Sequence, residues 1–141
     1  MNRSRVASVS KTVGIWVLTV LLGLFFVLQG VAKFTPSSPW PGMFEGWGYP
    51  AGFHLVIGAL ELLAGIFLFV PRVAGFAAAL LVLIMLGAFG THALHGEGPQ
   101  MASTAIFALL AGVMVWIRLP RRVGSSREVI PSAQRLEGGR P

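Results

Sequence analysis

Five polar side chains lie within or at the ends of apolar stretches of the sequence, where such groups are costly unless they have a partner or a role. They are Gln29, Lys33, His54, Glu61 and His92. A carboxyl group and an imidazole can hydrogen-bond a ligand or relay protons, and an ammonium can hold a carboxylate ionised or stabilise an anion. We therefore consider these five residues candidates for a ligand-binding or proton-relay site.

Glu61 is the most informative of the five. It lies about ten residues into its apolar stretch, roughly 15 Å from the outer end of a helix that rises 1.5 Å per residue. Gly58 and Gly65 share its helix face, and small residues let a neighbouring helix approach closely. We expect Glu61 to face the interior of a helix bundle. Two interpretations stay open: a functional carboxyl group, or a structural one that forms a packing hydrogen bond or pairs with Lys33.

The other candidates fall on the same outward half of the molecule. Gln29 and Lys33 are four residues apart and share a helix face. His54 lies two helical turns outward of the carboxyl group, and His92 ends another apolar stretch. Structural interpretations compete here too, because a lysine at a helix end can snorkel to the membrane interface, and His92 and His95 suit an ordinary loop.

Other kinds of site have weak support. His92, His95 and Glu97 form at most a partial metal site in a glycine-rich loop, so we predict no metal. A bis-histidine haem through His54 and His92 has no supporting motif. The chain has no cysteine and no aspartate, which excludes thiolate ligands, dithiol redox chemistry and a Ser-His-Asp triad within it. We assign no catalytic residue.

The elements that must position these residues are four apolar stretches near the length of about 20 residues that crosses a bilayer. Hydrophobic residues make up 55% of the 141-residue chain and charged residues 11%, fewer charges than a soluble domain carries. The sequence therefore predicts an all-α, integral membrane, four-helix antiparallel bundle. The predicted spans are Val13–Ala32, Ala51–Val70, Val73–Thr91 and Met101–Ile117. A signal peptide at the first span is disfavoured, because its apolar core is too long.

Basic residues predict the orientation. Of the 11 Lys and Arg residues, all but Lys33 lie in the N-terminal segment, at the Pro71-Arg72 turn or in the C-terminal tail. We therefore place both termini in the cytoplasm, with a basic segment at 1–12, a membrane domain at 13–118 and a disordered basic tail at 119–141. A lipid bilayer, and not nucleic acid, is the expected partner of this charge.

Residues 34–50, on the outer side, contain four prolines, which excludes a continuous helix. Four aromatic side chains in this segment, Trp40, Phe44, Trp47 and Tyr49, suit the membrane interface. We interpret them as an interfacial anchor, with a cap over the outer mouth of the bundle as the alternative.

From about Gly30 to Pro120 the chain resembles the DoxX-like branch of the DoxX family. The similar pieces, in order, are Gly30-Val31-Ala32-Lys33-Phe34, Gly48-Tyr49-Pro50, Ile57-Gly58-Ala59-Leu60-Glu61-Leu62, Pro71-Arg72 and Met85-Leu86-Gly87-Ala88-Phe89-Gly90-Thr91-His92. The resemblance implies a four-helix protein of the bacterial inner (plasma) membrane, in which Lys33, Glu61 and His92 occupy recurring polar positions. It also implies a link to redox enzymes, since the family name comes from a small subunit associated with a quinone-reducing oxidoreductase.

Our first hypothesis is thus a small redox-linked subunit that binds a quinone or a similar lipid-soluble ligand in the outward half of the bundle. Electron transfer would need a partner, such as a membrane or peripheral oxidoreductase subunit, because nothing in this chain is an evident electron carrier. An accessory role is therefore expected, and a homo-oligomer is compatible with it. The alternatives are a non-enzymatic membrane scaffold or assembly partner, and a small-solute carrier.

Overall fold

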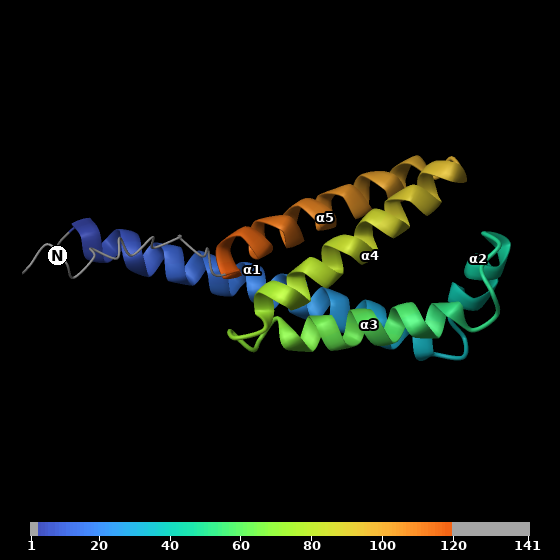
Figure 1. The fold of residues 1–141 in the computed structure, drawn as a ribbon, viewed down its shortest axis with the longest axis horizontal. Coiled ribbons are helices and arrows are strands. Elements are labelled where there is room, and N and C mark those ends of the chain that lie inside the picture. The colour runs from blue at the N-terminus through green and yellow to red at the C-terminus, as the bar shows by residue number, and fades with distance from the viewer. Residues whose placement is uncertain (1–2, 120–141) are drawn as a thin grey trace, which may run out of the picture.

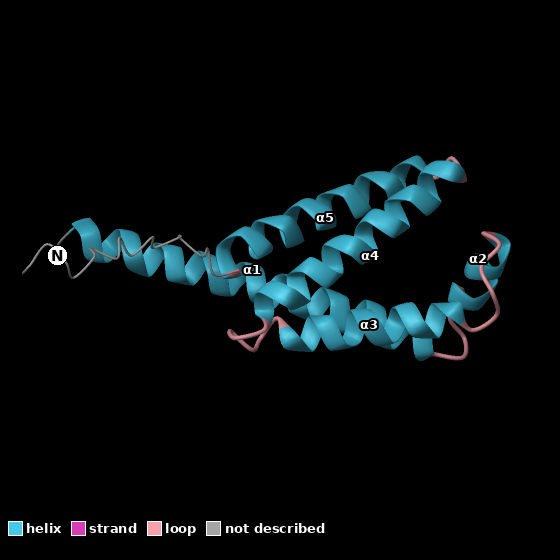
Figure 2. Ribbon diagram, viewed as in Figure 1, coloured by secondary structure: helices cyan, strands magenta, loops and turns pink. Residues whose placement is uncertain are grey.

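A computed structural model describes residues 3–119, and its regular structure in that range is helical without any strand (Figure 2). The helices are α1 (Arg3–Phe34), α2 (Trp40–Gly46), α3 (Phe53–Phe67), α4 (Ala74–Leu94) and α5 (Gly98–Arg118). The predicted all-α class is confirmed. The tail predicted to be disordered lies outside the described residues, apart from Leu119.

Three helices are long and apolar enough to cross a membrane, namely α1 over Arg5–Phe34, α4 and α5. The chain is therefore a multi-pass membrane protein by the length and composition of its helices. α3 is also apolar but has 15 residues. A helix of that length is about 23 Å long, less than the hydrocarbon core of about 30 Å.

α1 begins ten residues before the predicted first span, because residues 3–12 contain no glycine or proline that would end a helix. At 32 residues it is about 48 Å long, more than a bilayer core requires. Its first turns consequently project beyond the other helices (Figure 1).

The three long helices and α3 form two antiparallel pairs, α1 with α3 and α4 with α5 (Figure 1). Glycines explain the closeness of the first pair. A Cβ atom at Gly30 would lie 2.7 Å from the carbonyl oxygen of Gly58, and one at Gly65 would lie 2.9 Å from the backbone nitrogen of Val27. Only glycine lets these helix backbones touch.

The two pairs meet at the end of the molecule that carries the Arg72 turn and diverge toward the other end (Figure 1). Small side chains fill the junction, where Ala64, Ala78 and Ala111 are almost fully buried. Larger core residues pack around them, including Leu22, Phe26, Leu68, Leu81 and Met114. Phe25 and Phe107, with ring centroids 3.9 Å apart, lie where the core gives way to the space between the pairs.

The proline-rich segment at the diverging end contains the short helix α2, which was not predicted. Pro41 lies in its first turn, where a helix tolerates proline because the missing N–H would have no partner. Gly48 and Gly52 follow with φ angles of +86° and +81°, which glycine adopts without steric strain. These turns bring the chain from α2 back into α3.

Candidate functional site

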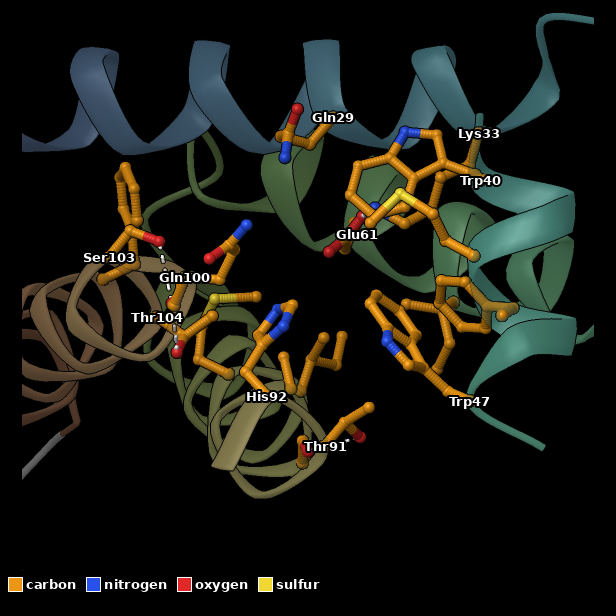
Figure 3. Close-up of a pocket in the computed structure, with 18 of the residues that line it drawn as sticks. Gln29, Lys33, Trp40, Trp47, Glu61, Thr91, His92, Gln100, Ser103 and Thr104 are labelled. Atoms are coloured by element: carbon orange, nitrogen blue, oxygen red, sulfur yellow. Dashed lines mark hydrogen bonds and ion pairs between the residues drawn. The ribbon is translucent and has the colours of Figure 1, made fainter. Parts of the chain in front are cut away.

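The space between the diverging helix pairs is a cavity of about 530 Å³ (Figure 3). This volume lies within the range of roughly 300–1,000 Å³ that is usual for small-molecule sites. All five helices contribute to the wall. Its surface is mostly apolar and strongly aromatic, with Phe25, Phe26, Trp40, Phe44, Trp47, Phe53 and Phe107 among the lining residues. Such a wall suits a flat, lipid-soluble molecule.

Lys33 and Glu61 form a buried ion pair in this wall, with 2.6 Å between Lys33 Nζ and Glu61 Oε2. Gly58 makes the pair possible, because the Cβ of Lys33 lies only 2.8 Å from the position that a Cβ of residue 58 would take. The lysine stem therefore crosses α3 directly over Gly58 and reaches Glu61 one turn away. The ammonium also lies 4.1 Å from the ring centroid of Trp40, a cation–π contact.

Gln29 lies one helical turn from Lys33 and lines the same cavity. Figure 3 shows its side chain extending from α1 into the space between the pairs. Its amide has no hydrogen-bond partner within residues 3–119, although it offers two donors and an acceptor. The amide is thus available to a bound molecule.

His92 reaches the cavity from α4 and points toward its centre (Figure 3). Its Nδ1 lies 2.5 Å from Glu97 Oε2. Because an ionised carboxylate only accepts hydrogen bonds, Nδ1 carries the proton. Nε2 of His92 has no partner among the described residues, so it can meet a ligand.

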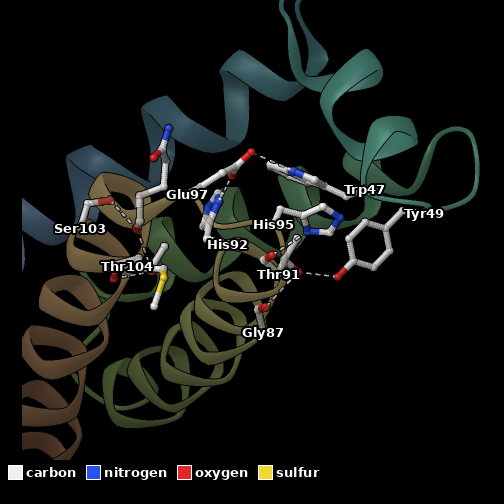
Figure 4. Close-up of polar contacts among 11 residues, drawn as sticks. Trp47, Tyr49, Gly87, Thr91, His92, His95, Glu97, Ser103 and Thr104 are labelled. Atoms are coloured by element: carbon white, nitrogen blue, oxygen red, sulfur yellow. Dashed lines mark hydrogen bonds and ion pairs between the residues drawn. The ribbon is translucent and has the colours of Figure 1, made fainter.

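Glu97 joins the segment after α2 to the end of α4 (Figure 4). It accepts the hydrogen bond from His92, and its Oε1 accepts a second one from Trp47 Nε1 at 3.2 Å. The hydrogen bond from His92 lowers the pKa of the Glu97 carboxyl group below its ordinary value of 4.5, and Trp47 adds a smaller lowering. Glu97 is therefore ionised at neutral pH.

A second link lies beside the first. Tyr49 OH is 2.6 Å from Thr91 Oγ1, and Thr91 donates its own hydrogen to the carbonyl oxygen of Gly87 at 3.1 Å, so the tyrosine is the donor. We call these contacts, Trp47–Glu97–His92 and Tyr49–Thr91, the outer clasp. The clasp ties the α2 segment to the α4–α5 connection. The alternative interpretation of the aromatic segment, a cap over the mouth of the bundle, agrees with this geometry better than a plain interfacial anchor.

The structure brings four of the five candidate residues to the cavity: Gln29, Lys33, Glu61 and His92. His54 is not among the residues that line it, and is buried against the Phe44 ring with centroids 6.2 Å apart. Its seven-residue spacing from Glu61 placed it on the correct face, but α2 covers that part of α3. His54 and His92 therefore do not share the cavity as a haem-binding pair would.

Glu97 and Trp47 are the site residues that sequence reasoning did not recognise in this role. From the sequence, Glu97 is a candidate only for a partial metal site with His92 and His95. In the part of the chain that the structure describes, no three His, Cys, Asp or Glu side chains are grouped to hold a metal ion. His95 instead donates from Nδ1 to the carbonyl oxygen of Thr91 at 2.8 Å. One feature of the sequence indicates the His92–Glu97 contact: an acidic residue lies five positions after a histidine, across a tight turn.

Comparison with known proteins gives one family. The profile of the DoxX-like family matches residues 17–114, a range that contains the cavity-lining polar residues and the outer clasp. No solved structure matches the chain.

Proposed function

The chain belongs to the DoxX-like family, and from that premise we propose that it is a redox-linked membrane subunit that binds a quinone or a similar lipid-soluble ligand. The observation that carries the proposal is the convergence of Gln29, the Lys33–Glu61 pair and His92 on one apolar cavity. A cavity of this kind, apolar with a few convergent polar groups, is the usual form of a small-molecule site.

The donor and acceptor set fits a quinone head. The oxidised head presents two carbonyl oxygens that accept hydrogen bonds, and the reduced head presents two hydroxyl groups that donate them. Gln29 can donate or accept, and His92 Nε2 accepts when the ring is neutral and donates when it is charged. The same side chains can therefore hold both forms of the head within an aromatic wall.

A bound quinone would supply the electron-carrying chemistry, and the chain would supply orientation and protons. Glu61 and His92 are the groups that can exchange a proton with a ligand in the cavity, and Lys33 holds the carboxylate of Glu61 in place. We assign electron transfer itself to a partner, a membrane or peripheral oxidoreductase subunit, with which this chain would act as an accessory subunit. A homo-oligomer is compatible with this arrangement.

We further propose that α3 crosses the membrane as a fourth span in company with α1, along which it packs. Both termini would then lie in the cytoplasm of a bacterium, with the chain in its plasma membrane. The basic residues support this orientation, because ten of the 11 lie on the side of the termini and the Arg72 turn. The cavity would then open in the outward half of the bilayer.

A scaffold without a ligand is the second candidate, and one observation favours it. Lys33 and Glu61 satisfy each other and connect α1 to α3, as a purely structural pair would. In that case the cavity polar groups would have no task beyond packing, and the chain would serve the assembly of a partner.

Solvent extraction of the purified protein tests the proposal. The protein would be purified in mild detergent and its extract analysed by mass spectrometry beside its ultraviolet spectrum. We expect quinone in the wild type and its loss, per folded molecule, in Glu61→Gln, in which the amide oxygen still accepts from Lys33. Glu45→Gln is the matched control, because it removes one charge from an exposed position of α2 that does not line the cavity.

Two results would contradict the proposal. Wild-type protein that carries only bulk lipid has no tightly bound quinone. If Glu61→Gln prevents accumulation of folded protein while quinone per folded molecule is unchanged, Glu61 serves the fold, and the scaffold becomes the better description.

A further inference from the structure

Arg118, the last residue of α5, has no acidic partner among residues 3–119. One guanidinium nitrogen donates to Thr19 Oγ1 at 3.2 Å, and Nε is buried with no hydrogen-bond partner in the described residues. Thr19 offers only a neutral oxygen, because its hydroxyl hydrogen is donated to the carbonyl oxygen of Ile15 at 2.7 Å. A guanidinium held in this way keeps donors that an anion could accept from.

No acidic side chain of the described part of the chain can supply that anion. The carboxylates between residues 3 and 119 are Glu45, Glu61 and Glu97, and all three lie at the cavity end of the molecule. The opposite end, where α5 finishes beside α1 (Figure 1), carries positive charges, including Lys11, Arg72 and Arg118. Within residues 3–119, therefore, the Arg118 guanidinium has no counter-charge.

An apolar groove adjoins Arg118. Trp16 lies with its ring centroid 5.7 Å from the guanidinium carbon, and the same ring borders a shallow groove of about 400 Å³ on the surface of α1. The groove is lined by Thr12, Val13, Trp16, Val17, Val20 and Leu21. All but Thr12 are apolar, so the groove suits a hydrocarbon chain and not a free ion.

The depth of Arg118 agrees with a lipid headgroup. α5 has 21 residues and is about 32 Å long, close to the thickness of the hydrocarbon core. Its last residue therefore lies at the membrane interface, where tryptophan rings such as Trp16 also prefer to lie.

We propose that Arg118 and Trp16 form a binding site for an anionic phospholipid, whose phosphate meets the guanidinium and whose acyl chain lies along the α1 groove. Arginine is suited to this role because its planar fork can donate two parallel hydrogen bonds to one phosphate. The site lies at the opposite end of the molecule from the cavity and does not depend on the quinone proposal.

Lipid titration monitored by native mass spectrometry tests this site. The detergent-purified chain would be titrated with phosphatidylglycerol and with phosphatidylcholine of identical acyl chains. We expect the wild type to prefer phosphatidylglycerol, and Arg118→Gln to weaken that binding about tenfold, a typical effect of losing a charged hydrogen bond. Arg72→Gln is the matched control, since it removes one charge from an exposed turn at the same end, and it should leave the preference intact.

Three outcomes would overturn the assignment. Equal binding of the two lipids would remove the anionic selectivity. An equal effect of Arg72→Gln and Arg118→Gln would reduce the site to diffuse attraction. Displacement of phosphatidylglycerol by an equal concentration of inorganic phosphate would show a free-anion site. If Arg118→Gln does not fold, Trp16→Leu serves instead, because Trp16 is exposed, and it should weaken phosphatidylglycerol binding without changing the circular dichroism spectrum.

Discussion

Lys33 and Glu61 lie 2.6 Å apart across the α1–α3 interface, each with 4% of its side chain exposed. This contact connects the fold to the cavity, because the pair fixes α1 on α3 and both residues also line the space between the helix pairs. The pair exists only because Gly58 leaves room for the lysine stem. Different substitutions of Lys33 and Glu61 can therefore separate the contribution of the pair to stability from its contribution to ligand binding.

Removal of one partner should be costly, and removal of both should not. Glu61→Leu leaves a buried ammonium without its carboxylate, and we expect it to lower the free energy of unfolding by about 3 kcal/mol, as for other broken buried pairs. The double variant Lys33→Met with Glu61→Leu leaves no buried charge and should recover most of that loss. Unfolding in mixed detergent micelles, followed by circular dichroism, measures both.

The interpretation depends on the comparison between the two variants. If the double variant is as unstable as Glu61→Leu alone, the ion pair itself stabilises the fold, and the loss in Glu61→Leu does not come from the unpaired ammonium. That result would contradict our expectation. Glu61→Gln should fall between wild type and Glu61→Leu, because its amide oxygen can still accept from Lys33.

The glycine contacts between α1 and α3 give a second prediction. Gly30→Ala would place a methyl group 2.7 Å from both the Gly58 oxygen and the Leu62 nitrogen, which are backbone atoms that cannot rotate away. We expect a destabilisation of about 1–3 kcal/mol, the usual range for overpacking. Gly14→Ala, in the same helix with no atom within 4 Å of the new methyl group, should be neutral or slightly stabilising. Thermal unfolding in detergent compares the two, and equal midpoints would contradict the close approach.

Much of this architecture could be predicted from the sequence. Hydropathy identified the apolar helices, because a membrane-spanning segment must be apolar over most of its length. The glycines flanking Glu61 placed it against a neighbouring helix, which α1 proves to be. The expected ends of α4 and α5 fall within a few residues of the observed ones.

The arrangement of the pairs could not be predicted. Apolar faces do not distinguish a neighbouring helix from lipid, so hydropathy contains no information about the divergence that creates the cavity. α3 is shorter than expected because the chain turns after Phe67, where the sequence is still apolar. The roles of Trp47 and Glu97 depend on a contact between residues 50 positions apart, which no local pattern encodes.

The outer clasp should respond to acid. The hydrogen bond from His92 lowers the pKa of Glu97, so the folded carboxyl group has a lower pKa than the unfolded one, whose ordinary value is 4.5. Its contribution to stability is therefore present above pH 4.5 and is lost as the pH falls through the lowered pKa. We expect backbone hydrogen exchange in residues 40–49, corrected for the intrinsic rate, to be slow at neutral pH. It should accelerate as the pH falls through the lowered pKa of Glu97.

Two variants test the assignment to Glu97. Glu97→Gln should abolish the acid-dependent step, because the amide does not titrate, whereas Glu45→Gln on the exposed face of α2 should keep it. If the step persists in Glu97→Gln, another group controls the clasp, and His92 and His95 are the titratable side chains nearest to it.

Gln29 distinguishes a ligand site from a scaffold most directly. Its amide faces the cavity with no hydrogen-bond partner in residues 3–119, so Gln29→Leu removes an unsatisfied polar group and replaces it with an apolar side chain of similar size. Both functions predict that the variant folds at least as stably as the wild type, because no protein hydrogen bond is lost. Only the quinone site predicts that bound quinone per folded molecule falls, by about tenfold for one lost hydrogen bond to the head group. Quinone content is measured by mass spectrometry on equally folded samples of the wild type and the variant. Quinone absent from both supports the scaffold, whereas quinone bound equally by both would remove this side chain from the site.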